Sequence, residues 1–455
     1  MSELPSRWTE GPMGDLLSRI EAGRSFKCSE RPAVPDEWGV IKVSAMTWRE
    51  FDDGENKAVL PDHKIDPRFE IRSGDLLFSR ANTVSYVGAV VHVGETRSRL
   101  LLSDKSLRLV PQSGISSRWL LYYLRTKDAR RYLESMASGT SDSMRNISQE
   151  SLRKLPVPVA PSGEQQRIVA AIEEQFSRLD TGAAALDRAN QRLVTLAKRV
   201  ILAAIPDVWP EHWQRTVVGN AGSVMLGRQR SPQYHSGPKM RHYLRVANVF
   251  EDRIDAEDVK SMHFDDDEYS RYVLRPGDVL LNEGQSPHLL GRPAMYRGDP
   301  PDVAFTNSLI RFHAGPGVLP SWALLTFRHH LHSKRFMRES QITTNIAHLS
   351  AGRFKNIEFP VPPIDEQEMI VTRTETLLSD IARMATLLDT QGVRTAALEN
   401  SILTAAFSGK LAEQDSSDEP ASVLIQRIAA ELASDTDQGI GRVPRPRSRR
   451  ERVTA

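Results

Sequence analysis

Two long stretches of the chain repeat apolar residues with the spacing of an α-helix. Residues 162–205 contain no proline, and apolar or small side chains recur every three or four positions; residues 365–408 show the same pattern. Such stripes cannot stay in water alone, so we expect the two helices to pack on each other as an antiparallel coiled coil. The alternative is that each stripe packs on its own globular domain. The residues expected in the seam are Ile172, Phe176, Leu179, Leu186, Leu193 and Val200 in the first helix, and Leu377, Ile381, Met384, Leu388, Leu398 and Ile402 in the second.

Short apolar runs bounded by Gly, Pro and Asp precede each helix and predict short strands. These runs repeat, because Asp75 in RSGDLLFSR and Asp278 in RPGDVLLNE lie 203 positions apart, as do Trp119 and Trp322. The pattern predicts an α+β protein with a pseudo-twofold repeat, in which two similar α/β domains are joined by the two helices. The expected segments are a first domain over 1–158, a first helix over 159–206, a second domain over 207–360, a second helix over 361–411, and an acidic linker, short helix and Arg-rich disordered tail over 412–455.

Composition narrows the class of protein. Of 455 residues, 40% are hydrophobic and 26% charged, which is ordinary for a globular protein. The net charge is only +2, so a surface for nucleic acid has to be local. The single cysteine, Cys28, excludes an internal disulfide framework, and no apolar run is long enough to span a bilayer. We therefore expect a cytoplasmic protein.

The repeated motifs are similar to those of one known family, the specificity subunits of type I restriction–modification systems. The motifs are the two G-D-[LV]-L turns and two P-V-P segments that lead into Glu164-Gln165 and Glu366-Gln367, together with the helix endings VILAAI and ILTAAFSGKL. The resemblance covers Trp8 to Leu411. It implies that each domain is a target recognition domain that reads one half of a split site on double-stranded DNA, and that each long helix is a spacer.

The same resemblance implies the partners. They are modification (methyltransferase) subunits, two in number, which methylate adenine, and a restriction/translocase subunit. S-adenosylmethionine would be held by the methyltransferase, so we expect this chain to bind no cofactor and no metal.

Polar residues that differ between the repeats are the candidates for DNA contact. Arg and Lys suit phosphates and guanine, Asn and Gln suit adenine, and Glu accepts a hydrogen bond from cytosine. Because the two sets differ, we expect the two half-sites to differ, which makes the target asymmetric. The first set is Arg80, Asn82, Thr83, Tyr86, Lys105, Arg108, Ser141 and Arg145. The second set is Asn282, Glu283, Gln285, His288, Arg292, Asn307, Thr343, Thr344 and Asn345.

No catalytic residues are predicted for this chain. Asp36 followed by Glu55 and Lys57 fits a nuclease string of two acids and a lysine, but the repeat places Lys239 where the first copy has Asp36. We interpret the string as a coincidental surface pattern. The alternative function is a self-sufficient DNA methyltransferase or nuclease with an unrecognised site.

Overall fold

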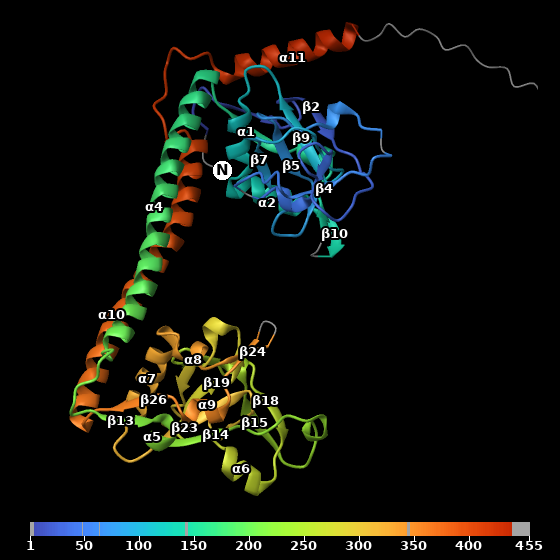
Figure 1. Cartoon of the computed structure of the whole chain (residues 1–455). Helices are drawn as coiled ribbons and strands as arrows, with labels where there is room; N and C mark the ends of the chain where they lie inside the picture. Colours follow the sequence, from blue (N-terminus) through green and yellow to red (C-terminus); the bar gives the residue numbers. More distant parts are fainter. Residues whose placement is uncertain (1–3, 48, 63, 142–143, 344–345, 439–455) are drawn as a thin grey trace, which may run out of the picture. The chain divides into compact units, whose positions relative to one another are not determined.

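The computed structural model describes residues 4–438, except 48, 63, 142–143 and 344–345. These residues divide into two units (Figure 1). The first comprises the described residues up to Ala184 and those from Gly392 onward, and the second comprises those from Ala185 to Gln391. The two long helices are α4 (Ser162–Ala203) and α10 (Ile364–Phe407). Each is divided between the units, with one part in the first unit and the other part in the second. Among the described residues, no helix combines the length and the apolar character that crossing a membrane requires.

In the described part of the first unit the strands form four sheets, and three short helices lie between β9 and β12. A four-stranded sheet has the order β2-β9-β5-β7, and smaller sheets have the orders β4-β3-β8, β10-β11-β6 and β1-β12. Its strands are β1 Thr9–Pro12, β2 Leu17–Ala22, β3 Gly39–Ile41, β4 Asn56–Ala58, β5 Leu76–Ser79, β6 Ala81–Asn82, β7 Val90–His92, β8 Leu100–Leu101, β9 Ser106–Pro111, β10 Ser138–Ser141, β11 Met144–Asn146 and β12 Pro156–Val159. Its short helices are α1 Ser117–Leu124, α2 Lys127–Met136 and α3 Gln149–Arg153.

The second unit repeats this topology. The sheet β14-β23-β19-β21 corresponds to β2-β9-β5-β7, and the orders β18-β15-β22, β20-β25-β24 and β13-β26 match the three smaller sheets. The strands are β13 Gln214–Val217, β14 Gly222–Leu226, β15 Met240–Leu244, β16 Val249–Phe250, β17 Arg253–Ile254, β18 Lys260–His263, β19 Val279–Asn282, β20 Gly284–Gln285, β21 Pro293–Met295, β22 Ala304–Phe305, β23 Leu309–Ala314, β24 Gln341–Thr343, β25 Ile346–His348 and β26 Glu358–Val361. The short helices are α5 Val218–Ala221, α6 Asp266–Tyr272, α7 Pro320–His332, α8 Arg335–Arg338 and α9 Ala351–Lys355. The predicted α+β repeat is confirmed.

The Gly-Asp turn of each repeat starts the central strand of the larger sheet. Gly74 and Gly277 have φ values of 92° and 95°, a conformation that favours glycine. The next residue closes the turn, because a carboxylate oxygen of Asp75 accepts the backbone N–H of Arg72 at 2.9 Å, and Asp278 does the same for Arg275 at 2.8 Å. The motif is therefore a turn that leads directly into β5 or β19.

A buried tryptophan anchors each proline-rich segment. The Nε1–H of Trp119 donates to the carbonyl of Pro158 at 3.0 Å, and that of Trp322 donates to Pro360 at 2.9 Å. Both prolines lie in the strand that ends at the long helix, β12 or β26. The repeated Trp thus ties helix α1 or α7 to the strand that precedes the long helix.

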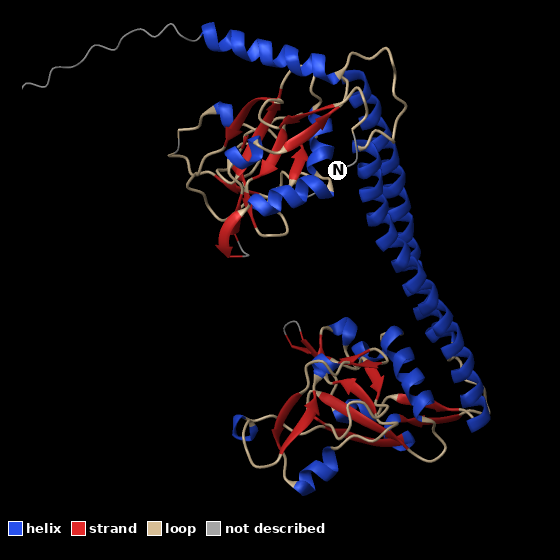
Figure 2. Cartoon of the chain, turned by 180° about the vertical axis from the view of Figure 1, so that it is seen from behind, coloured by secondary structure: helices blue, strands red, loops and turns tan. Residues whose placement is uncertain are grey.

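The part of α4 in each unit lies beside the part of α10 in the same unit (Figure 2). In the first unit Ile172 of α4 is buried in one cluster with Leu403 and Ala406 of α10 and with Trp119 of the domain. The apolar stripe therefore packs partly on the other helix and partly on the domain. The other predicted seam residues that are half-buried are Phe176, Leu179, Leu186, Leu193, Val200, Ile381, Leu388 and Ile402.

Three seam predictions were wrong. Leu377, Met384 and Leu398 are 43%, 53% and 51% exposed. The reason is that α10 carries apolar residues on more than one side, and its spacing alone does not tell which side faces α4. The side that is buried or half-buried in the second unit follows Val371, Thr374, Leu378, Ile381, Ala385 and Leu388.

The short helix predicted after the acidic linker is α11 (Ala421–Gln438), which packs on the first unit through the buried residues Ala421, Leu424 and Ile428. The Arg-rich tail predicted beyond it, residues 439–455, lies outside the described residues.

Candidate nucleic-acid interface

A small sheet follows the central strand of the first unit and carries several predicted DNA contacts. Strand β11 pairs with β6, with Arg145 opposite Asn82 and Asn146 opposite Ala81. Arg80, between β5 and β6, reaches Asn146 with its Nε at 3.5 Å from the amide oxygen. After β6 the Thr83 carbonyl accepts the backbone N–H groups of Tyr86 and Val87, and Tyr86 in this turn is 42% exposed. The structure thus brings Arg80, Thr83, Tyr86 and Arg145 to one edge of the unit.

The second unit has the equivalent sheet with different side chains. Strand β25 pairs with β20, with His348 opposite Gly284 and Ala347 opposite Gln285. The carboxylate of Glu283 lies 3.3 Å from Nδ1 of His348, and His288 is exposed in the following turn. This edge therefore offers a carboxylate, an amide and imidazoles where the first unit offers guanidinium groups and a phenol.

Four predicted contacts hold the fold instead of facing outward. Asn82 is buried, and its amide group donates to the Val43 carbonyl at 3.3 Å; Asn282 is fully buried and donates to the Val249 carbonyl at 3.3 Å. Arg108 lies between Asp75 and Glu21, at 2.9 and 2.7 Å from their carboxylates. Arg292 donates twice to the Val249 carbonyl and stacks on Phe250. Asn82 and Asn282 are buried, and the guanidinium groups of Arg108 and Arg292 are held by other segments of the fold, so we no longer expect these four residues to contact DNA.

The remaining predicted residues lie beside the small sheets, at strand ends, or outside the described residues. Lys105 and Asn307 are half-buried next to the small sheets, and the Lys105 carbonyl accepts the backbone N–H of Arg80 at 3.0 Å. Ser141 and Thr343 end strands β10 and β24, whose side chains there are not described. Thr344 and Asn345 lie outside the described residues.

The repeated Glu-Gln pair connects each long helix to its domain. The Gln165 side chain accepts the backbone N–H of Ser116 at 3.1 Å and donates to the Ala160 carbonyl at 2.8 Å. Gln367 accepts the N–H of Leu319 at 2.9 Å and donates to the carbonyls of Gly317 and Pro362 at 2.9 and 2.8 Å. Sequence reasoning used this motif only as a family marker and missed that its glutamine bridges the domain and the helix.

The neighbouring glutamate has a tryptophan beside it in both units, Trp213 beside Glu366 in the second and Trp8 beside Glu164 in the first. In the second unit Glu366 accepts the Nε1–H of Trp213 at 3.0 Å, and its other oxygen lies 2.9 Å from Nε2 of His212. The equivalent residue in the first unit, Glu164, is buried, and its burial raises the pKa of the carboxyl group.

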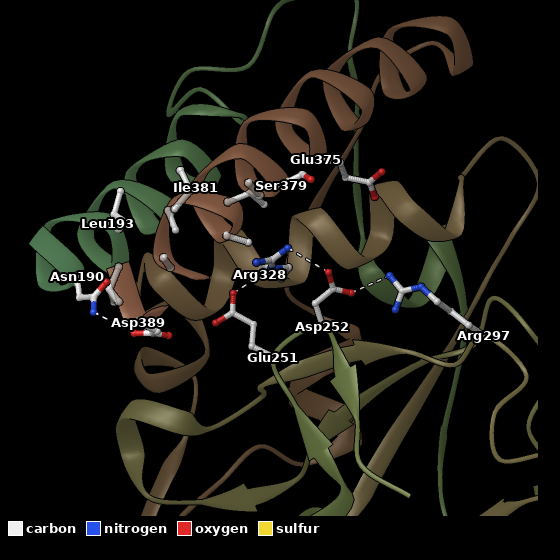
Figure 3. A pocket seen from close by; sticks show the side chains of 15 residues that line it. Asn190, Leu193, Glu251, Asp252, Arg297, Arg328, Glu375, Ser379, Ile381 and Asp389 are labelled. Atoms are coloured by element: carbon white, nitrogen blue, oxygen red, sulfur yellow. Dashed lines mark hydrogen bonds and ion pairs between the residues drawn. The ribbon is translucent and has the colours of Figure 1, made fainter. Parts of the chain in front are cut away.

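A charged pocket of about 770 Å³ lies between the domain and the helices of the second unit (Figure 3). The two acids that the domain contributes are paired, since Arg328 lies 2.9 Å from Glu251 and 3.5 Å from Asp252, and Arg297 lies 2.9 Å from Asp252. Burial alone would raise the pKa of Glu251, but the hydrogen bond from His332 and the charge of Arg328 hold it below the usual value. The helices supply apolar side chains on the other side, among them Leu193, Val194, Leu378 and Ile381.

The first unit attaches its domain to the helices by ion pairs. Arg49 contacts the carboxylate of Glu399 on α10, and it lies 3.7 Å from that of Asp180 on α4. In the second unit the acids Glu251 and Asp252 pair with Arg328 and Arg297 of the domain itself. The two domains thus share a fold and a glutamine bridge but differ in the surrounding charges.

The residues of the nuclease string do not meet. Lys57 pairs with Glu30 at 2.8 Å, Glu55 lies 3.5 Å from Lys42, and the Asp36 side chain is fully exposed. Within the described residues no group of three His, Cys, Asp or Glu side chains has the arrangement of a metal site.

Comparison with known proteins identifies similar chains. No family model matches the sequence. It is 34% identical over 206 residues to the type I restriction enzyme EcoEI specificity subunit of Escherichia coli, a stretch that covers 45% of this chain and 34% of that one. It is 23% identical to the EcoKI specificity subunit of Escherichia coli (strain K12) and 21% identical to the StySPI specificity subunit of Salmonella potsdam; both alignments cover 95% of this chain, with 97% and 96% of the relatives.

Two solved structures share the fold. A chain from a study of complex assembly and conformational transition of the type I R-M system superposes with a TM-score of 0.65 at 18% identity, over 90% of this chain and all of that one. The HsdS subunit from Thermoanaerobacter tengcongensis superposes with a TM-score of 0.51 at 18% identity, over 90% of this chain and 98% of that one.

Proposed function

Because this chain belongs to the family of type I restriction enzyme specificity subunits, we propose that it recognises a split, asymmetric DNA target for partner subunits that methylate adenine and cleave DNA. Each unit reads one half of the target. This role on cellular DNA also implies a cytoplasmic location.

One observation carries the proposal. The two units have the same order of strands, yet the edge formed by β6-β11-β10 carries Arg80 and Tyr86 where β20-β25-β24 carries Glu283 and Gln285. A constant frame with variable polar groups is what two readers of different base sequences need, because base edges differ in their donors and acceptors. The half-sites that the two units read are therefore expected to differ.

Partner subunits would bind the long helices. Several apolar side chains of α4 and α10 in the second unit are exposed, and they include Val194, Leu196, Met369, Met384 and Leu387. Exposed apolar groups that form a patch are typical of interfaces between proteins. We propose that two modification subunits bind these helices and that a restriction/translocase subunit joins the complex. The methyltransferase would hold S-adenosylmethionine.

We propose that this chain itself is not catalytic. Its contribution is to position DNA, and the acids and lysine of the nuclease string are engaged in separate ion pairs. Incubating the purified chain with DNA, S-adenosylmethionine and Mg²⁺ should give neither methylated nor cleaved DNA. Methylation or cleavage that persists at constant specific activity through successive purification steps would establish the alternative, a self-sufficient enzyme.

The direct test is to sequence the methylome of cells that carry this chain together with its modification subunits. We expect one methylated motif made of two short words separated by a gap of fixed length, with different words on the two sides. Cells that lack only this chain are the control, and they should lose the motif. A continuous or palindromic motif would contradict the proposal.

A further inference from the structure

A depression of about 600 Å³ in the first unit is lined by four cationic side chains. Arg24, Lys42, Lys57 and Lys105 border it, against two acids, Glu30 and Asp104. The excess of positive charge suits an anion. The single cysteine of the chain, Cys28, also lines the depression.

The four cations differ in how far the protein already neutralises them. Lys57 lies 2.8 Å from Glu30 and Lys42 lies 3.5 Å from Glu55, while the Arg24 guanidinium lies 4.9 Å above the Phe69 ring. No described residue pairs with the ammonium group of Lys105. Lys105 and the exposed Arg24 are thus the cations open to a ligand.

In the second unit, protein side chains surround the arginine that is equivalent to Arg24. The backbone of Arg24 forms an isolated β-bridge with that of Ser103, and the backbone of Arg228 forms the equivalent β-bridge with that of Thr306. The Arg228 guanidinium lies 3.9 Å from the centre of the Tyr234 ring and 4.6 Å from that of Phe264. It also pairs at 2.5 Å with Glu268 of helix α6, so only 6% of its side chain is exposed. The repeat puts Ser308 where the first unit has Lys105. The second unit therefore lacks both open cations.

The depression adjoins the edge that we assign to base reading. The Lys105 carbonyl accepts the backbone N–H groups of Arg80 and Ala81, at 3.0 and 3.3 Å, at the start of β6. A phosphate bound by Lys105 would therefore lie near Arg80, because the backbones of these two residues are hydrogen-bonded. We propose that this depression binds a phosphate group of the DNA backbone beside the half-site read by the first unit, and that the second unit has no equivalent contact. The inference rests on the proposed function.

The first test uses Cys28 as a reporter in the complex with the modification subunits. Desolvation raises the pKa of the Cys28 thiol, so alkylation with uncharged iodoacetamide is followed at pH 8.5 on the Cys28 peptide by mass spectrometry. We expect a duplex that carries the target to slow alkylation at least fivefold, and 1 mM inorganic phosphate or ATP to have little effect. Protection by phosphate or ATP but not by the duplex would assign the depression to a free anion and overturn the proposal.

The second test replaces Lys105→Ser, the residue that the second unit has at this position. Loss of one phosphate contact should weaken binding of the target duplex roughly fivefold to tenfold at 0.1 M salt and lower the slope of log K against log salt by about 0.9. Lys154→Ser, which removes an exposed lysine of the same unit paired with Glu150, is the matched control and should change neither quantity.

Neutral methylphosphonate linkages then locate the contact. One linkage beside the first half-site should weaken binding of the unmodified chain and have no effect on Lys105→Ser. If Lys105→Ser binds with an unchanged salt slope, or no linkage distinguishes the two proteins, the phosphate contact is refuted. A split methylation motif can persist in that case, so failure of this inference is distinguishable from failure of the proposed function.

Discussion

Removing the glutamine bridge should loosen one domain from its helix and leave the other attached. Gln367 is fully buried and makes three hydrogen bonds, whereas Gln165 makes two. At about 1 kcal/mol for each hydrogen bond, Gln367→Ala should destabilise the attachment by about 3 kcal/mol and Gln165→Ala by about 2 kcal/mol. These are local costs, so they should appear first as opening of the segments that the glutamines bridge.

Hydrogen exchange of the bridged amides measures this opening. In Gln367→Ala the Leu319 amide should exchange about a hundredfold faster, while the Ser116 amide is unchanged; Gln165→Ala should reverse the pattern with a rise of about thirtyfold. The exposed neighbour Gln166 provides the matched control, and Gln166→Ala should alter neither amide. If the Ser116 amide exchanges at the same rate in Gln165→Ala as in Gln166→Ala, the Gln165 side chain does not attach the domain to the helix.

Three further outcomes are expected. The pKa of His330 is lowered to about 3 because burial and the neighbouring His329 disfavour its charged form, so the neutral form stabilises the second unit at pH values above 6.5 and this stability is lost as pH falls toward 3. From pH 8 to pH 5 the loss is about 2 kcal/mol, and His330→Gln should remove that part of the pH dependence in urea unfolding; an unaltered pH dependence would show that His330 is not responsible. Replacing the exposed Leu387 with Lys should weaken assembly with the modification subunits at least tenfold in a titration while the circular dichroism spectrum stays the same, and full-strength assembly would remove α10 from the interface. Inserting seven residues into both α4 and α10 keeps the phase of the seam and adds about 10 Å, so the gap in the methylated motif should change by about 3 base pairs; an unchanged gap would mean that the helices do not set it.

The sequence predicted the repeat and the long helices because both depend on local signals. Gly74 and Gly277 mark turns that require a left-handed conformation, and the 3.6-residue spacing marks a helix wherever it occurs. The same kind of signal located the edge that carries Arg80 and Tyr86, since it follows the Gly-Asp turn directly.

Side-chain partners from distant segments could not be predicted in the same way. Asn82 and Asn282 are polar residues in a variable stretch, and only the fold places the carbonyls of Val43 and Val249 against them. The exposure of Met384 depends on which side of α10 faces α4, and the local spacing allowed more than one answer. Such contacts depend on packing between segments far apart in the chain, and the spacing of apolar residues within one segment carries no information about that packing.

The most direct measurement of the central claim compares methylomes after changing the edge of one unit. The variant Arg80→Ala with Tyr86→Ala alters the first unit, and Glu283→Ala with Gln285→Ala alters the second. If each unit reads one half of the target, the first variant should relax or change one word of the split motif and leave the other word intact, and the second variant should do the converse. Changes in both words from either variant, or in neither from both, would contradict the account.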